Sequence, residues 1–436
     1  MQRTIVVIVS AIALVFVSFI FLHVAAPQTQ AQTAADVVIS EHSELGKILT
    51  DADGNTLYLF TNDERKISNC SGGCAEAWPP LLTGGAPLAG EGLDSERLEV
   101  IDRGDGSSQV SYNGWPLYYY RDDASVGDAN GQDRGDVWYV VSPFGGPIQT
   151  NAQVEIIEHT ILGTMLVDRS GRSQYLFTRD DNDLSNCSGG CALAWPPLLT
   201  VGDPVAGEGL EAERLTVINR EDGSSQVAYN GKSLYYYFND EKPGDAVGQD
   251  RGDVWYVVSP FGGPIMTNAF VTTSPNEELG PILTDRSGRT LYLFTRDEKD
   301  LSNCSGGCAL AWPPLLTTDA PVADGGVFVG LLGTTSRDDG SAQVTYDGSP
   351  LYYFDRDEKP GDTNGQDRGE VWFVVSTSGQ AIQSATASEA QPTSPSVGDP
   401  YIPAIMKLAL SVSILLILIG GFIVLRKKTG LVADQL

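Results

Sequence analysis

The chain has 436 residues, of which 42% are hydrophobic and 19% are charged, and its formal net charge is −28. This composition is typical of a turn-rich globular protein and excludes a disordered chain. The strong negative charge excludes nucleic acid and anionic lipid headgroups as partners, because both require a basic surface.

The first 31 residues have the layout of a secretory signal peptide or of an uncleaved membrane anchor. Arg3 precedes an uncharged apolar run from Ile5 to Leu22, and small and polar residues follow. Cleavage is expected after Ala26 or after Ala31. This segment contains no cysteine, so it offers no site for lipid attachment.

The C-terminal part predicts a single membrane-spanning helix. Residues 384–402 are rich in Ser, Thr and Pro and predict a flexible stalk. Residues 403–425 include 18 uncharged residues, long enough to cross a bilayer, and the basic tail 426–436 is expected in the cytoplasm. The predicted location is therefore the cell membrane, with everything between the two apolar segments on the extracytoplasmic side.

A motif with two cysteines and a Trp-Pro-Pro segment occurs three times, each copy 117 residues after the previous one. The cysteine pairs are Cys70 and Cys74, Cys187 and Cys191, and Cys304 and Cys308, and the tryptophans are Trp78, Trp195 and Trp312. This period predicts three tandem modules, at residues 38–149, 155–266 and 274–383.

Short alternating segments separated by Gly- and Asp-rich turns predict an all-β module, like a sandwich or a barrel. The expected strands of module 1 are 48–50 and 56–60 as a hairpin, 97–102 with 109–112 as a second pair, then 117–120 and 137–141. Only Ala75 to Ala77 is expected to form a helical turn. Because Gln174 replaces Leu57 in the second module, the face with Tyr58 and Phe60 is expected to be the core.

The pattern Tyr-x-aromatic-x-x-Asp occurs twice in every module, so each module is interpreted as an internal duplication. The six copies are Tyr58, Phe60 and Asp63; Tyr118, Tyr120 and Asp123; Tyr175, Phe177 and Asp180; Tyr235, Tyr237 and Asp240; Tyr292, Phe294 and Asp297; and Tyr352, Phe354 and Asp357.

These motifs resemble the bacterial secreted-repeat family of unknown function, whose members are predicted lipoproteins with a Tyr-x-(Phe/Trp/Tyr)-x-x-Asp motif. The resemblance extends over roughly residues 45–378. It implies an extracytoplasmic, membrane-associated repeat protein and carries over no catalytic residue. The chain departs from the family in lacking the lipid-attachment cysteine, which the C-terminal helix is expected to replace.

Each cysteine pair is expected to form a structural disulfide, because the modules lie outside the cytoplasm. A redox role is the alternative, but no neighbouring Lys or His is present in the sequence to lower a thiol pKa. A zinc site would need more thiols or imidazoles than a module contains.

Acidic loops give a second, weaker set of candidates, for Ca²⁺. Asp128 and Asp133, with Asp362 and Asp367, lie in Gly-rich loops close to other carboxylates. Tight turns explain the same composition, and the sequence favours that interpretation. His42 and His159 occupy matching positions, but Asn276 replaces them in module 3, so a ligand role is not favoured.

No catalytic constellation appears, so the sequence favours a non-enzymatic protein. Three equivalent modules favour multivalent binding or a structural role at the cell surface, with a cell-wall polymer or a surface protein as partner. The alternative is an accessory protein in extracytoplasmic redox or metal-ion handling.

Overall fold

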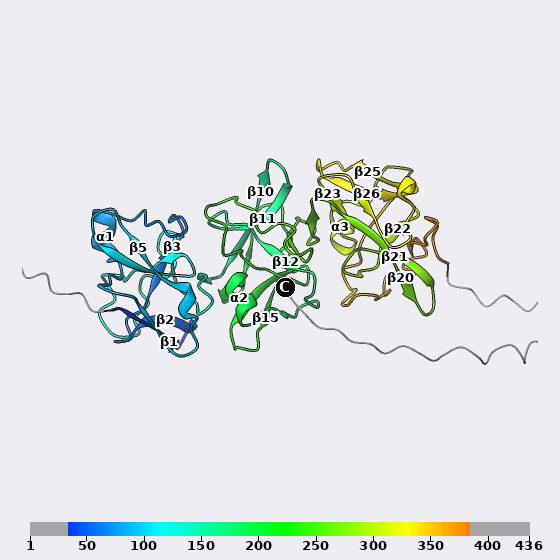
Figure 1. Cartoon of the computed structure of the whole chain (residues 1–436). Helices are drawn as coiled ribbons and strands as arrows, with labels where there is room; N and C mark the ends of the chain where they lie inside the picture. The colour runs from blue at the N-terminus through cyan, green and yellow to red at the C-terminus, as the bar shows by residue number, and fades with distance from the viewer. Residues whose placement is uncertain (1–33, 384–436) are drawn as a thin grey trace, which may run out of the picture. The chain divides into compact units, whose positions relative to one another are not determined.

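The computed structural model describes residues 34–383, which are mostly β with a few short helices (Figure 1). The predicted signal segment 1–31, the predicted stalk 384–402 and the predicted membrane helix 403–425 lie outside the described residues. Among residues 34–383, no helix has both the length and the apolar character needed to span a membrane.

The three modules repeat one order of elements. Module 1 contains β1 (Asp36–His42), β2 (Gly46–Asp51), β3 (Tyr58–Phe60), α1 (Gly73–Ala77), β4 (Leu88–Ala89), η1 (Ser95–Arg97), β5 (Leu98–Asp102), β6 (Ser108–Tyr112), β7 (Trp115–Pro116), β8 (Trp138–Val140) and β9 (Ile148–Thr150). Module 2 contains β10 (Gln153–His159), β11 (Gly163–Asp168), β12 (Tyr175–Phe177), α2 (Gly190–Ala194), β13 (Leu199–Val201), β14 (Val205–Ala206), η2 (Ala212–Arg214), β15 (Leu215–Asn219), β16 (Ser225–Tyr229), β17 (Lys232–Ser233), β18 (Trp255–Val257) and β19 (Ile265–Met266). Module 3 contains β20 (Phe270–Asn276), β21 (Gly280–Thr284), β22 (Tyr292–Phe294), α3 (Gly307–Ala311), β23 (Leu316–Thr317), β24 (Val322–Ala323), η3 (Val329–Leu331), β25 (Leu332–Ser336), β26 (Ala342–Tyr346), β27 (Ser349–Pro350) and β28 (Trp372–Val374).

The second predicted strand pair is confirmed as the antiparallel pair β5–β6, and the predicted helical turn is confirmed as part of α1. Asn113 and Gly114 follow β6 with φ of 50° and 88°, the left-handed conformation that a two-residue hairpin turn requires. Both features depend on residues close in sequence.

The predicted hairpin of 48–50 with 56–60 is confirmed only next to its turn. Thr50 and Thr56 form an antiparallel bridge, and the Leu57 amide donates to the Leu49 carbonyl at 3.0 Å, but the extended pairing of β2 is with β1. β3 pairs instead with β8, with Phe60 opposite Trp138. The end of the module therefore closes onto its beginning, a long-range contact that local patterning does not reveal.

The prediction of a single core face on β3 is also wrong. Tyr58, Leu57 and Leu59 are all fully buried. Tyr58 belongs to a core with Trp78 and Trp138, whereas Leu57 and Leu59 belong to a core with Tyr139. Both faces of β3 are therefore apolar, because the strand lies between two cores. Gln174, which replaces Leu57 in module 2, is buried as well, so its polarity does not indicate an exposed face.

One short parallel strand links each module to the next. β9 follows β8 of module 1 but pairs with β13 of module 2, with Ile148 opposite Leu199. β19 pairs with β23 of module 3 in the same manner, with Ile265 opposite Leu316. Successive modules therefore share a sheet.

Candidate functional site

The two Tyr-x-aromatic-x-x-Asp motifs of a module are hydrogen-bonded to each other. The Tyr58 hydroxyl donates to the carboxylate of Asp123 at 2.7 Å, and the Tyr118 hydroxyl donates to Asp63 at 2.7 Å. Each tyrosine therefore pairs with the aspartate of the other half.

The same crossed pairs recur in the other two modules, at 2.6–2.8 Å. They are Tyr175 with Asp240, Tyr235 with Asp180, Tyr292 with Asp357, and Tyr352 with Asp297. The motif thus explains the internal duplication, because each half supplies the acceptor for the other.

Burial shifts the titration of these carboxyls upward. It raises the pKa of Asp63, Asp240 and Asp357 to about 7 and that of Asp180 to about 6. Burial also raises the pKa of the partner tyrosines, so they remain hydrogen-bond donors at neutral pH.

All three predicted disulfides are present, Cys70–Cys74, Cys187–Cys191 and Cys304–Cys308. The backbone carbonyl of Cys70 accepts a hydrogen bond from the buried guanidinium of Arg103 at 2.6 Å. The same guanidinium donates to Ser68 and Gln109. This arginine was not predicted from the sequence, although Arg220 and Arg337 keep the 117-residue step and repeat these contacts.

The tryptophan of the repeat lies inside a column of rings. Phe60 stacks on Trp138 with ring centres 4.2 Å apart, Trp138 stacks on Trp78 at 4.0 Å, and Trp78 lies against Tyr120 at 4.4 Å. Arg134 covers the outer ring, 5.3 Å from its centre. The other columns are Phe177, Trp255, Trp195, Tyr237 and Arg251, and Phe294, Trp372, Trp312, Phe354 and Arg368.

Glycine is required where the loop before β8 meets this column. A Cβ atom on Gly131 would lie 2.8 Å from the Trp78 ring and 2.9 Å from the Tyr58 ring. The Gly131 amide donates to the Tyr58 hydroxyl at 3.3 Å. Because the two tryptophan rings are only 5–7% exposed, the column serves as a core.

The weak Ca²⁺ candidates Asp128 and Asp362 cap turns with their side chains. Asp128 accepts from the backbone amides of Ala124 and Ser125, and Asp362 accepts from those of Glu358 and Lys359. Asp133 and Asp367 have positive φ values of 57° and 59°. Within residues 34–383, no three His, Cys, Asp or Glu side chains form a group that could hold a metal ion.

Turn capping also explains the histidine pattern. Nδ1 of His42 accepts hydrogen bonds from the amides of Glu44 and Leu45, and His159 makes the equivalent contacts. Oδ1 of Asn276 accepts from the corresponding two amides in module 3. Asn and His are interchangeable here because both present one acceptor to the turn.

A groove of about 800 Å³ lies where modules 1 and 2 meet. One wall is the hairpin β1–β2, and the other is contributed by β15, β16 and the turn between them. Apolar lining comes from Phe144, Ile148 and Leu199, and acidic residues are provided by both modules, namely Glu41, Glu44, Asp203 and Asp222. Its size is within the range of small-ligand sites.

An equivalent groove of about 640 Å³ lies where modules 2 and 3 meet. Phe261, Ile265 and Leu316 replace the three apolar residues of the first groove. Ile161, which is 71% exposed, occupies the position of Glu44 and makes this groove more apolar. Neither groove was predicted from the sequence, because each is formed by two modules.

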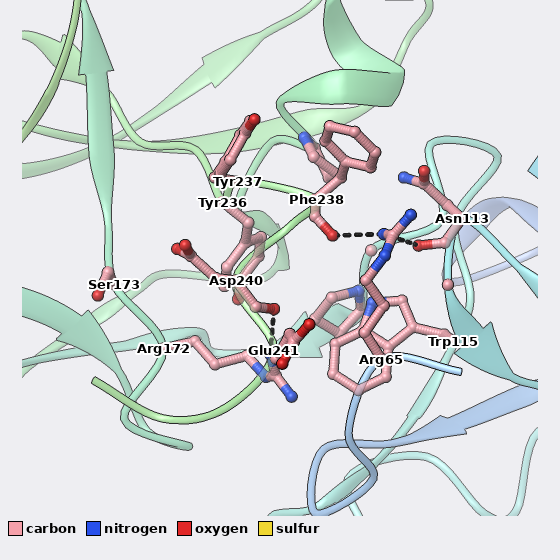
Figure 2. A pocket seen from close by; sticks show the side chains of 14 residues that line it. Arg65, Asn113, Trp115, Arg172, Ser173, Tyr236, Tyr237, Phe238, Asp240 and Glu241 are labelled. Atoms are coloured by element: carbon pink, nitrogen blue, oxygen red, sulfur yellow. Dashed lines mark hydrogen bonds between the residues drawn. The ribbon is translucent and has the colours of Figure 1, made fainter. Parts of the chain in front are cut away.

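A small cavity at the first junction is lined by residues of both modules (Figure 2). Arg65 of module 1 donates to the carbonyl oxygen of Phe238 at 2.6 Å, and Arg172 lies over the Trp115 ring, 4.1 Å from its centre. The cavity has about 30 Å³, the space of one water molecule. We therefore interpret this region as a joint between modules rather than a ligand site.

A family model described as a secreted repeat of unknown function matches six segments of the chain. They are residues 41–82, 99–142, 159–199, 216–259, 273–316 and 333–376. Two segments fall in each module, in agreement with the internal duplication. Searches of curated proteins and of solved structures gave no significant match.

Proposed function

The chain belongs to the family of secreted repeats of unknown function, and from that premise we propose that it is a membrane-anchored binding protein of the cell surface. Its ligand sites are the two junction grooves, and its ligand is a cell-wall polymer that carries amino groups. The proposal rests on one observation, that equivalent grooves occur at both junctions.

The proposed anchoring follows from the ends of the chain. Residues 1–31 direct export, and residues 403–425 hold the protein in the membrane with modules 38–149, 155–266 and 274–383 outside. The segment 384–402 then acts as a spacer between the membrane and module 3. The extracytoplasmic location of the repeats agrees with the description of the family.

The proposed ligand follows from the chemistry of the grooves. Apolar residues line them, and carboxylates of Glu41, Glu44 and Glu158 border them. Such a surface favours an extended ligand with both apolar faces and positive charges, and disfavours an anionic polymer. Two sites on one chain also raise the overall affinity for a repeating polymer, because the second contact is intramolecular.

Binding of the full chain, reconstituted in liposomes, to purified amino-bearing wall polysaccharide tests the proposal. Val217→Arg changes the first groove and Ile161→Arg changes the second, at side chains that are 37% and 71% exposed. Both changes replace an apolar side chain with a cation that repels the amino groups of the ligand. We expect each single variant to lose the avidity gain, which is on the order of 10²–10⁴-fold for linked sites, and the double variant to lose binding at both grooves.

Val126→Arg is the matched control, because Val126 is 70% exposed and lines neither groove. Its binding should equal that of the unchanged chain. Equal binding by all variants would place the ligand elsewhere. If the chain binds a surface protein and has no affinity for the polysaccharide, the proposed class of ligand is wrong.

A further inference from the structure

The second module junction contains a buried lysine that the proposed function does not use. Lys232 lies on β17 at the position of Trp115 in module 1 and is 7% exposed. Its Nζ atom contacts Oδ1 of Asn182, in the loop after β12. Nδ2 of the same Asn182 donates to the carbonyl oxygen of Asp355 in module 3 at 2.7 Å, which fixes the orientation of the amide.

The surroundings of this amine favour its neutral form. Burial lowers the pKa of Lys232 well below its ordinary value, and the guanidinium of Arg289 lowers it further. The carboxyls of Asp180, Asp183 and Asp357 act in the opposite direction. Burial raises the pKa of Asp180 to about 6 and that of Asp357 to about 7, so protonated carboxyls are present at mildly acidic to neutral pH.

We propose that Lys232 and Asn182 form an intramolecular isopeptide bond. The lone pair of Nζ attacks Cγ of Asn182 and forms the new C–N bond. The bond from Cγ to Nδ2 then breaks, and its electron pair leaves with the nitrogen. One proton passes from Nζ to that nitrogen, so one ammonia is released and neither oxidant nor reductant is needed.

Only the second module has both groups. Module 1 has Arg65 and Trp115 at these two positions, and module 3 has Lys299 and Ser349. The inference therefore specifies one crosslink per chain. It would close a covalent loop between β17 and the segment after β12, and the hydrogen bond from Nδ2 of Asn182 to Asp355 would be lost with the released ammonia.

Mass spectrometry of the full chain tests the bond directly. With the cysteines reduced and counted and the N-terminal residue determined, we expect a mass about 17 Da below that calculated from the sequence from that residue onward, which corresponds to one ammonia. A proteolytic digest should contain one branched peptide that joins the segments around Asn182 and Lys232. Trypsin should fail to cleave after Lys232, since its amine is acylated.

The variants Lys232→Arg and Asn182→Ala should both restore the full mass. Lys232→Arg separates the proposal from a cyclic imide at Asn182, which would also lose ammonia but would persist without the lysine. Circular dichroism of each variant checks that the chain is folded. An unmodified mass in the unchanged chain, or a mass deficit retained in Lys232→Arg, would overturn the inference.

Discussion

The hydroxyl of Tyr58 donates a 2.7 Å hydrogen bond to the carboxylate of Asp123, which lies 65 residues later in the other half of the same module. The reciprocal bond runs from Tyr118 to Asp63. A module built from two related halves is thus held together by the motif that makes them alike.

Tyr118→Phe should destabilise module 1. The change removes the donor to Asp63, which is 1% exposed, and leaves a buried carboxyl with one partner fewer. We expect a loss of roughly 1–3 kcal/mol in the free energy of unfolding. The measurement is the shift of the urea midpoint.

Tyr120→Phe is the control for that experiment, since its hydroxyl bonds to the exposed Asp122. This variant should stay within about 0.5 kcal/mol of the unchanged chain. If Tyr118→Phe and Tyr120→Phe lower the free energy of unfolding equally, the hydrogen bond from Tyr118 to Asp63 stabilises the module no more than a surface contact does.

Arg220→Met should cost more than Arg103→Met. Both arginines donate to a serine, a glutamine and a cysteine carbonyl, but only Arg220 also lies over the Phe144 ring of the preceding module, 5.2 Å from its centre. Each change should cost roughly 2–4 kcal/mol through unsatisfied buried groups.

The excess for Arg220→Met should be about 0.5–1 kcal/mol, the contribution of one cation–π contact. Equal losses, measured by urea unfolding of both variants, would show that the ring contact does not couple the modules.

The sequence predicted the local parts of this fold and missed the long-range ones. The β5–β6 pair with its Asn113–Gly114 turn depends on neighbouring residues, and so does the disulfide. The pairing of β3 with β8 joins residues about 80 positions apart, and alternation within one strand does not specify a partner.

The candidate site was harder to predict, for a related reason. Buried Arg103 was recognisable from the copies at Arg220 and Arg337, because a repeated arginine in an acidic chain suggests a fixed partner. The two grooves have no comparable signal in the sequence, because no single repeated residue indicates that two modules meet there. Phe144 and Leu199 are brought together by the pairing of β9 with β13, which places one strand of a module in the sheet of the next.

The disulfides distinguish the binding function from the redox alternative. Cys70 and Cys187 are fully buried. A structural bond should therefore resist mild reductant, and the folded chain should take up no thiol label. Replacing Cys70 and Cys74 together with alanine should cost about 2 kcal/mol, because the closed loop is short.

Two results would instead support the redox role. The cysteines of the folded chain would take up a thiol label rapidly under mild reduction, and replacing Cys70 and Cys74 with alanine would leave the free energy of unfolding unchanged. The matched control is the pair Cys304 and Cys308, where the same substitutions should have the same effect.

The stability of the modules should fall as the pH rises from about 4 to about 7. Burial raises the pKa of Asp63, Asp240 and Asp357 from 3.8 to about 7 in the folded chain. Over that window the unfolded chain binds fewer protons than the folded chain, so the free energy of unfolding decreases with pH. Thermal unfolding at pH 5 should therefore occur at a higher temperature than at pH 8. Asp63→Asn cannot ionise, so it should reduce the pH dependence of unfolding that module 1 contributes. A thermal midpoint of the unchanged chain that rises between pH 5 and pH 8 would contradict the raised pKa of these aspartates.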